Sequence, residues 1–183
     1  NNLFLAVKGK NNDGNKFINS ALMKGAGCAV SSSVIKKTKK KLIKIKNSNL
    51  FLNKFAKLKR EYSLAKIIAI TGSAGKTSLK NLLNNLLQDI GSTHSSPKSF
   101  NNHLGVPISL SNLSANDKYG IFEVGMSKAG EIKNLTKLIK PQIGIITNIG
   151  EAHLENFKNI NGIAKAKSEI IENIEFGGTV ILN

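Results

Sequence analysis

The sequence is poor in cysteine, in acidic residues and in long apolar runs. Cys28 is the single cysteine among 183 residues, which excludes an internal disulfide framework. The longest apolar runs fall well short of the roughly 20 residues of a membrane helix, and no secretory signal peptide is visible. We therefore expect a reducing, cytoplasmic setting and no membrane insertion. Internal repeats and low-complexity linkers are missing too, and a hydrophobic content of 40% suffices for one ordinary domain or two small ones.

Acidic side chains are scarce relative to basic ones, which gives a formal charge of +16. The excess is local, because residues 1–63 hold 15 basic and two acidic side chains whereas residues 64–183 hold 12 and nine. Its densest part is "KKTKKKLIKIK", residues 36–46, which contains no aromatic side chain or arginine that could stack on bases. Such a run is typical of a solvated face, so we expect no nucleic-acid partner. A nucleic-acid-binding module that uses this run is the alternative.

The first part of the chain has the pattern of a small α/β unit. Strands are predicted over residues 3–7, 27–34 and 41–45, and a short helix over residues 17–25 is expected to stop at a glycine. Apolar side chains then recur every three or four residues over 49–62, which predicts an amphipathic helix. We place a domain boundary near residue 63.

The second part alternates strands with helices. The predicted strands are residues 67–71, 119–124, 143–150 and 178–183. The helices predicted between them are residues 79–90, 128–139 and 162–174. This order builds a parallel sheet with crossover helices. We therefore predict an α/β protein with a small N-terminal domain, residues 1–63, followed by a mostly parallel-sheet domain, residues 64–183. Because the sequence stops on an apparent strand, we expect the second domain to be incomplete.

The stretch "IIAITGSAGKTSLKNLL" predicts a phosphate cradle between a buried strand and a helix. A glycine-rich turn in that position presents backbone N–H groups and a helix N-terminus to anionic oxygens. Lys76 and Thr77 stand where a P-loop has the lysine that reaches the terminal phosphates and the hydroxyl that holds magnesium. Ile70 replaces the first glycine of the general spacing, so a simple glycine turn is the alternative.

Three later side chains are candidates for the same site. Glu123 ends a predicted strand, and the carboxyl ends of parallel strands are where doubly wound sheets bind ligands, so its carboxylate could meet magnesium. His153 lies in a loop after the next strand, and Lys167 lies on a helix among small and apolar residues. Taken one at a time, each is also compatible with an ordinary role: an exposed strand end, a surface or core histidine, and a solvated lysine.

Together these stretches resemble the Mur ligases, ATP-dependent enzymes that build the peptide of bacterial cell-wall precursors. The segments "ITGSAGKTS", "FEVGMSKAGEI", "TNIGEAHLENF" and "AKAKSEI" have that family's order and spacing. Within the family, "SFNNHLGVPISL" is similar to the member that joins D-Ala-D-Ala to UDP-MurNAc-tripeptide, and residues 3–26 are similar to its N-terminal domain, which holds the uridine nucleotide. Resemblance covers nearly the whole chain.

The resemblance implies roles for individual residues. It implies that the ATP phosphates are held by seven successive residues: Gly72, Ser73, Ala74, Gly75, Lys76, Thr77 and Ser78. It also implies two Mg²⁺ ions, the first on Thr77 and Glu123 and the second on His153 and Lys167, whose amine carries CO₂ as a carbamate. Lys76, His153 and Lys167 would be the catalytic residues. Asn101 and Asn102 match paired asparagines that contact the nucleotide-sugar substrate, and they are also residues that turns favour.

The reaction implied is acyl activation. A carboxylate of UDP-MurNAc-tripeptide attacks the γ-phosphate of ATP to give an acyl phosphate, and the amine of D-Ala-D-Ala then displaces phosphate. Cations at the junction neutralise the repulsion between carboxylate and triphosphate. Another Mur or folate-polyglutamate ligase, or an unrelated P-loop phosphotransferase, remains an alternative, and the third residue of the accepted peptide, diaminopimelate or lysine, stays open. Family members are more than twice as long, so we expect a monomeric fragment that does not ligate by itself.

Overall fold

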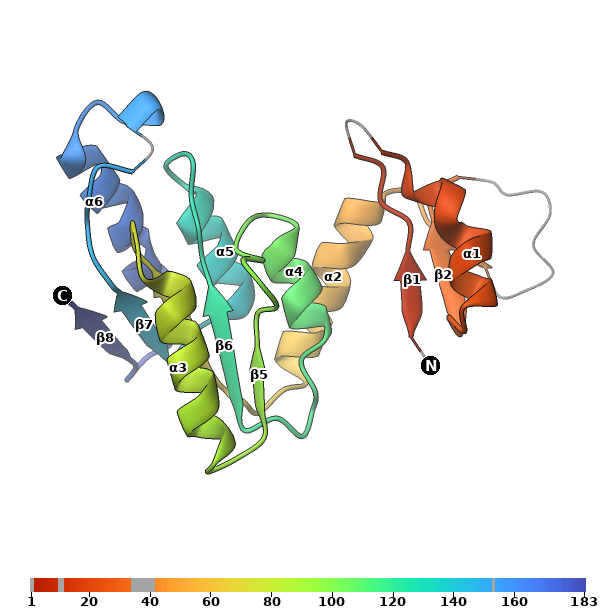
Figure 1. Cartoon of the computed structure of the whole chain (residues 1–183), viewed down its shortest axis with the longest axis horizontal. Helices are drawn as coiled ribbons and strands as arrows, with labels where there is room; N and C mark the ends of the chain where they lie inside the picture. The colour runs from red at the N-terminus through yellow and green to blue at the C-terminus, as the bar shows by residue number, and fades with distance from the viewer. Residues whose placement is uncertain (1, 10–11, 34–41, 153) are drawn as a thin grey trace. The chain divides into compact units, whose positions relative to one another are not determined.

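The computed structural model describes residues 2–9, 12–33, 42–152 and 154–183. The chain divides into two compact units, residues 1–54 and 55–183, with the division inside helix α2. Both units combine helices with parallel strands (Figure 1), so the predicted α/β class is confirmed. His153 and residues 36–41 of the lysine-rich run lie outside the described residues. Within the described ranges, no helix is long and apolar enough to cross a membrane.

The first unit is a three-stranded parallel sheet in the order β1-β2-β3. Its elements, together with the helix that leaves it, are β1 Leu3–Leu5, the 3₁₀ helix η1 Gly14–Phe17, α1 Ile18–Met23, β2 Cys28–Ser31, β3 Leu42–Lys44 and α2 Ser48–Glu61. Ile18 and Leu22 stand four residues apart on α1 and pack on Ala29 of the sheet. The buried hydroxyl of Ser31 donates a hydrogen bond of 2.6 Å to Oδ1 of Asn15, so the strand and the 3₁₀ helix are also joined by a polar contact.

The second unit is a five-stranded parallel sheet in the order β5-β6-β4-β7-β8. Its elements are β4 Lys66–Thr71, α3 Lys76–Gln88, β5 Thr93–Ser95, α4 Gly105–Ser111, β6 Tyr119–Glu123, α5 Glu131–Ile139, β7 Ile143–Ile146, η2 Leu154–Asn156, α6 Ile160–Ser168, η3 Glu169–Asn173 and β8 Thr179–Leu182. The chain moves outward from β4 to β5, returns through β6, and then crosses to β7 on the other side of β4. The strand order therefore reverses at β4, and ligands of such sheets bind outside the carboxyl ends of the strands at that point.

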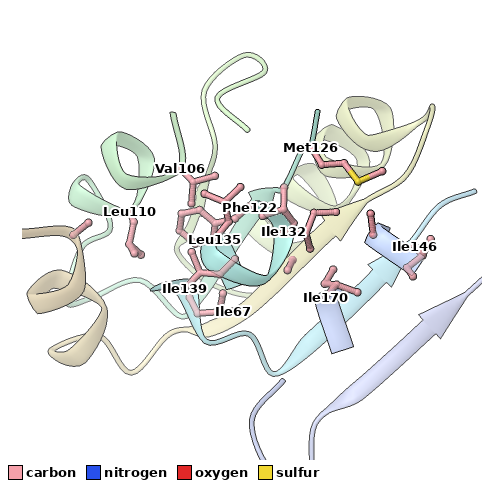
Figure 2. Close-up of a cluster of buried hydrophobic side chains, with 14 of the residues drawn as sticks. Ile67, Val106, Leu110, Phe122, Met126, Ile132, Leu135, Ile139, Ile146 and Ile170 are labelled. Atoms are coloured by element: carbon pink, nitrogen blue, oxygen red, sulfur yellow. The ribbon is translucent and has the colours of Figure 1, made fainter. Parts of the chain in front are cut away.

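Helices cover both faces of this sheet (Figure 1). Successive side chains of β4 point to opposite sides, so the two faces of the strand pack against different helices. Ile68 and Ile70 face α3 and pack against its half-buried leucines. Ile67 and Ala69 belong to the larger core on the other face, formed with α4, α5 and α6. Figure 2 shows this core gathered around Phe122, which is fully buried. Each large side chain buried in this way contributes about 1.5–3 kcal/mol, so the sheet is a rigid base for the loops at its edge.

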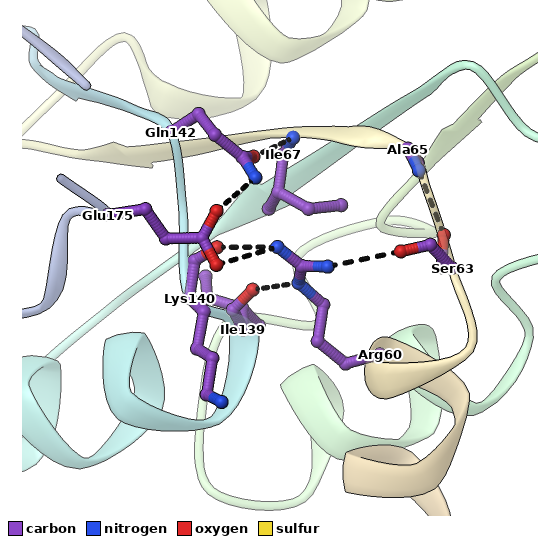
Figure 3. A network of polar contacts seen from close by, with 8 residues as sticks. All are labelled: Arg60, Ser63, Ala65, Ile67, Ile139, Lys140, Gln142 and Glu175. Atoms are coloured by element: carbon purple, nitrogen blue, oxygen red, sulfur yellow. Dashed lines mark hydrogen bonds and ion pairs between the residues drawn. The ribbon is translucent and has the colours of Figure 1, made fainter. Parts of the chain in front are cut away.

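Arg60, near the end of α2, is the centre of a polar network shown in Figure 3. Its guanidinium donates hydrogen bonds to three carbonyl oxygens, at 2.6 Å to Ile139, 2.9 Å to Lys140 and 3.3 Å to Ser63. It also forms an ion pair of 3.5 Å with Glu175. The main-chain carbonyls at the end of α5 have no partner within the helix, so Arg60 satisfies groups that burial would otherwise leave unpaired.

Three elements of the second unit were not predicted: β5, α4 and the short 3₁₀ helix η2. The strand β5 has only three residues, all half-buried, and so shows no apolar alternation. The helix α4 begins with Gly105 and carries Pro107, residues that usually break helices. Pro107 is accommodated because it lies in the first turn, where backbone N–H groups need no partner within the helix. The predicted helix over 162–174 consists of α6 and the tighter helix η3, and β7 covers only Ile143–Ile146 of the segment predicted over 143–150.

Candidate active site

A cavity of about 530 Å³ lies at the carboxyl ends of the strands in the second unit. The residues that line it come from the loops after β4, β5, β6 and β7 and from helices α3, α5 and α6. Of the predicted site residues it gathers Gly72, Ser73, Lys76, Asn101, Asn102 and Lys167. The chain thus brings together three segments that are far apart in sequence. Ala74, Gly75, Thr77, Ser78 and Glu123 belong to the adjoining loop, the first turn of α3 and the end of β6, without lining the cavity.

The loop between β4 and α3 has the backbone of an anion cradle. Gly72 has φ +152°, and Gly75 has φ +80° at the N-terminal cap of α3. A Cβ atom on Gly72 would stand 1.9 Å from Oγ1 of Thr147, so the close approach of β4 and β7 requires glycine here. The N–H group of Ala74 donates a hydrogen bond of 2.9 Å to Oδ1 of Asn148, which holds the loop open toward the helix N-terminus. Such an arrangement of N–H groups attracts phosphate.

Lys76 and Lys167 place two positive charges at the same cavity. Nζ of Lys76 donates a hydrogen bond of 2.6 Å to the carbonyl of Gly72, which holds the side chain over the loop. Burial lowers the pKa of Lys76, although the charge of Glu123 acts in the opposite direction. Lys167 is 3% exposed, and burial, together with repulsion from Lys76, lowers its pKa to about 8. An anion in the cavity would relieve the repulsion between these two amines.

Glu123 is fully buried at the end of β6. Its Oε1 atom forms an ion pair of 3.1 Å with Nζ of Lys80, but neither carboxylate oxygen accepts a hydrogen bond from a residue that the structure describes. The buried hydroxyl of Thr71, at the end of β4, also has no hydrogen-bond partner within the described ranges. Buried polar atoms without hydrogen-bond partners are rare and cost free energy. A polar ligand bound at this end of the sheet would therefore satisfy these atoms.

Asn101 and Asn102 line the cavity and also shape its wall. The carbonyl of Asn101 accepts a hydrogen bond of 2.8 Å from the N–H group of Gly125, which joins the loop after β5 to the loop after β6. Oδ1 of Asn102 accepts from the N–H groups of Leu104 and Gly105, at 3.1 and 2.9 Å, and so caps the start of α4. The turn role that the sequence allowed is therefore present in Asn102, alongside its position at the cavity.

Three further residues near the cavity were not identified from the sequence. His103 and Glu131 line it, and Lys80 contacts Glu123. Oε2 of Glu131 accepts hydrogen bonds from two N–H groups ahead of α5, those of Ser127 and Lys128. The glutamate at the start of the predicted helix was a visible signal of such capping. No signal in the sequence points to Lys80, because its partners lie on β6 and in the segment after β5.

The described residues form no closed metal cage. Among the described residues, no group of three or more His, Cys, Asp and Glu side chains could hold a metal ion. That set leaves out His153, which was predicted as a metal ligand. A site for Mg²⁺ does not require such a cage, because Mg²⁺ is commonly held by one or two carboxylates together with phosphate oxygens of the substrate. Glu123, with its two oxygens free of hydrogen bonds, matches that kind of site.

Comparison with known proteins identifies the family of the second unit. Residues 70–183 match the Mur ligase middle domain. The UDP-N-acetylmuramoyl-tripeptide–D-alanyl-D-alanine ligases of Rickettsia prowazekii and Escherichia coli are 44% and 34% identical to the chain over 99% of its length. The chain spans about 40% of the length of these curated relatives.

Solved structures agree with this result. The chain is similar to MurF from Acinetobacter baumannii, with a TM-score of 0.85 and 34% identity over 98% of this chain and 40% of that one. It is also similar to the MurF ligase of Thermotoga maritima in complex with ADP, with a TM-score of 0.82 and 31% identity over 98% of this chain and 42% of that one. The match of the middle domain to more than half of the residues shows that the chain belongs to the Mur ligase family.

Proposed function

We propose that the chain is part of an ATP-dependent amide ligase that joins D-Ala-D-Ala to UDP-MurNAc-tripeptide in peptidoglycan precursor synthesis. The carrying observation is the convergence of Lys76, Asn101 and Lys167 on one cavity at the point where the strand order reverses. The cavity combines a phosphate-binding lysine, a polar wall and a second amine. These groups could hold a triphosphate and a carboxylate close to one another. The names of the most similar relatives support this choice of substrates.

In this proposal the loop after β4 holds the ATP phosphates. Within the loop of residues 72–78, the N–H groups of Ser73 and Ala74 donate to Asn148. The N–H groups at the N-terminus of α3 and the ammonium of Lys76 would therefore face the negative charge. The hydroxyl of Thr77 and the carboxylate of Glu123 would hold one Mg²⁺, which neutralises charge on the phosphates when bound. Neither oxygen of Glu123 accepts a hydrogen bond from a described residue, although Oε1 is ion-paired with Lys80, and a bound cation would satisfy the carboxylate further.

Lys167 is proposed to carry a carbamate. The ammonium first loses one proton, and the neutral amine then adds CO₂ and releases a second proton, so a cation becomes a carbamate anion. The lowered pKa of about 8 leaves more of the Lys167 amine neutral at physiological pH than an exposed lysine would have. A carbamate would turn repulsion from Lys76 into attraction, and it would provide oxygens for a second Mg²⁺. The resemblance to the family adds His153 as a partner ligand of that ion.

The remaining assignments also follow from the family. Residues 1–63 would bind the uridine part of the substrate, and residues 64–183 would bind ATP. Asn101 and Asn102 would contact the nucleotide-sugar substrate near the reacting carboxylate. That carboxylate would attack the γ-phosphate, and the amine of D-Ala-D-Ala would then displace phosphate from the acyl phosphate. We further propose that the ligase is a monomer and acts in the cytoplasm, where ATP is available.

The test uses the complete protein that contains this chain. We expect release of ADP and phosphate only when both UDP-MurNAc-tripeptide and D-Ala-D-Ala are present. Lys167→Ala should lower the turnover rate at least about a hundredfold, the loss expected when a residue that supports the metal is removed. Lys165→Ala, an exposed lysine of the same helix, is the matched control and should keep the native rate.

Two outcomes would contradict the proposal. ADP release without the dipeptide, or with an amino acid in its place, would indicate another member of the family. A panel of amine acceptors and of substrates with diaminopimelate or lysine as third residue then identifies the true pair. Full activity of Lys167→Ala after careful removal of bicarbonate would overturn the carbamate.

A further inference from the structure

Lys80 is a buried lysine that the proposed reaction does not use. It lies on α3, one turn after Lys76, and is 2% exposed. Burial of an ammonium group costs several kcal/mol unless the charge is paired and its N–H groups are hydrogen-bonded. A lysine at this position of an exposed helix would reach solvent, so its burial requires specific partners on other elements.

Those partners come from two different segments, the end of β6 and the loop after β5. Nζ of Lys80 forms the ion pair of 3.1 Å with Oε1 of Glu123, at the end of β6. It also donates hydrogen bonds of 2.8 Å to the carbonyl of Ser96 and 2.6 Å to the carbonyl of Lys98, in the segment after β5. One ammonium therefore joins α3, the end of β6 and the segment after β5 at a single point.

The backbone of Lys98 is strained in the conformation that this contact requires. Its φ is +50°, in the left-handed region that residues other than glycine rarely adopt. In this conformation its carbonyl accepts the hydrogen bond from Lys80. Such a conformation persists only where surrounding contacts hold it.

The segment fixed in this way leads directly to the wall of the cavity. Asn101 follows Lys98 by three residues, lines the cavity and accepts a hydrogen bond of 2.8 Å from the N–H group of Gly125. Gly125 in turn follows Glu123 by two residues. A Cβ atom on Gly125 would stand 3.0 Å from Cγ of Asn101, so the two loops are in close contact. Lys80 and Asn101 are thus two successive links between the same pair of loops.

We propose that Lys80 is a positioning residue that couples the carboxylate of Glu123 to the segment 96–101. This inference rests on the proposed function, in which Glu123 holds Mg²⁺ and Asn101 contacts the nucleotide-sugar substrate. The ion pair occupies Oε1 and leaves Oε2 open, so Lys80 fixes the direction in which the carboxylate can bind a cation. The hydrogen bonds to Ser96 and Lys98 fix the segment that carries Asn101. One side chain outside the cavity therefore positions both the carboxylate that would hold the metal and the segment that would contact the substrate.

The first measurement is amide hydrogen exchange of the unliganded chain, read for peptides that cover residues 96–104. Lys80→Met removes two charge-assisted hydrogen bonds, so exchange in these peptides should accelerate at least about tenfold. Exchange across β7, Ile143–Ile146, should stay within about twofold of the native rate. Lys137→Met, an exposed lysine of α5, is the matched control and should leave both regions unchanged.

Two further variants separate positioning from a role in stability alone. Glu123→Gln keeps the hydrogen bonds of Lys80 to the carbonyls, so its segment 96–101 should exchange at the native rate. Lys80→Met combined with Glu123→Gln leaves no buried charge unpaired and should fold, yet its segment should exchange as fast as in Lys80→Met alone. A native exchange rate in the double variant would overturn the proposal, as would equal acceleration over the whole second unit.

The complete protein provides the functional measurement. Lys80→Met should raise KM for the nucleotide-sugar substrate about tenfold and should raise KM for Mg²⁺–ATP as well, because Lys80 holds both the segment of Asn101 and the carboxylate of Glu123. A rise of KM for ATP alone would contradict a role in placing Asn101, and a rise of KM for the nucleotide-sugar substrate alone would contradict a role in placing Glu123. A separate measurement tests the proposed function itself. If Mg²⁺-dependent nucleotide binding were unchanged in Glu123→Gln, Glu123 would not hold the metal, and the hydrogen-exchange result would still stand.

Discussion

Ser73 and Gly150 form a reciprocal pair of hydrogen bonds. Oγ of Ser73 donates to the carbonyl of Gly150 at 2.9 Å and accepts from its N–H group at 3.0 Å. These bonds join the phosphate loop to the loop after β7, which leads to residue 153. The N–H group of Ser73 also donates to the carbonyl of Asn148 at 3.2 Å, so the two loops are connected along their length. The loop after β4 is therefore held in place before any nucleotide binds.

Ser73→Ala tests whether this connection supports nucleotide binding. The variant loses both side-chain hydrogen bonds, each contributing about 1 kcal/mol. Nucleotide binding to the variant must therefore also order the loop, which the native contact already holds in place, and this cost weakens binding. We expect the affinity for Mg²⁺–ATP, measured by calorimetry, to fall about tenfold. Ser168→Ala is the control, since that hydroxyl donates to the carbonyl of Lys165 in its own helix. Equal affinities of the Ser73 variant and the native chain would show that the contact does not preorganise the loop.

Gly72→Ala should disrupt the phosphate loop more strongly. The new Cβ atom would meet Oγ1 of Thr147 at 1.9 Å, and the φ of +152° is unfavourable for any side chain. We expect the free energy of unfolding, measured with urea, to fall by about 1–3 kcal/mol, together with loss of measurable nucleotide binding.

Gly130→Ala is the matched control for that variant. Gly130 also has a positive φ, +84°, but no atom lies within 4 Å of the position where its Cβ would stand. It should lose about 1 kcal/mol of stability and keep its affinity for nucleotide. If both variants behaved alike, the backbone conformation rather than the contact with Thr147 would account for the effect.

The sequence predicted most of the second unit because its strands and helices are marked by apolar periodicity. The run at 67–71 became β4, and the leucines after Lys76 became the face of α3 that packs on the sheet. Patterns of this kind depend on local spacing alone. The family resemblance, rather than spacing, predicted that Lys76, Thr77, Glu123, His153 and Lys167 meet at one site. Lys76 and Lys167 line one cavity, Thr77 and Glu123 lie beside it without lining it, and His153 lies outside the described residues.

What the sequence could not predict depends on contacts between distant segments. Lys80 follows an apolar position on α3 and has the pattern of a solvated lysine, but its three partners lie after β5 and on β6. The strand β5 is recognisable only through its pairing with β6 over Thr93–Ser95. In both cases the partner, rather than the local sequence, determines the structure.

Arg60→Met should destabilise the second unit. Arg60 is 8% exposed and donates to the carbonyls of Ile139 and Lys140, which would be left buried without donors. Loss of hydrogen bonds from a buried charged group predicts a decrease of about 3 kcal/mol in the free energy of unfolding, measured with urea. Lys57→Met, which breaks an exposed ion pair of 3.7 Å with Glu61, should change it by less than about 0.5 kcal/mol.

Arg60→Lys distinguishes charge from geometry. A lysine keeps the positive charge, but its ammonium cannot reproduce the planar set of donors that contacts several carbonyls at once. We expect a loss of about 2 kcal/mol, intermediate between the native chain and the methionine variant. Native stability of Arg60→Lys would show that charge alone is needed at this position.

His94 should make the second unit sensitive to acid. Nε2 of His94 lies 3.1 Å from Oγ of Ser109, and the ring packs against Phe122 with 5.7 Å between centroids. Burial lowers the pKa of His94 below its usual 6.5; the charge of Asp117 and the contact with Ser109 raise it, and Lys59 lowers it further. As the pH falls through 6.5, the unfolded chain therefore binds a proton that the folded chain does not yet bind. The free energy of unfolding should fall with pH from 6.5 down to the lowered pKa and level off below it.

His94→Gln removes this proton, so its free energy of unfolding should depend less on pH than that of the native chain between pH 7 and 5, as measured by urea unfolding at a series of pH values. The carboxylates that titrate at lower pH are common to both proteins, so the difference between them isolates the imidazole. Parallel curves for the native chain and His94→Gln would mean that the folded and unfolded states bind the proton equally well, and burial of the ring would then carry no cost in acid.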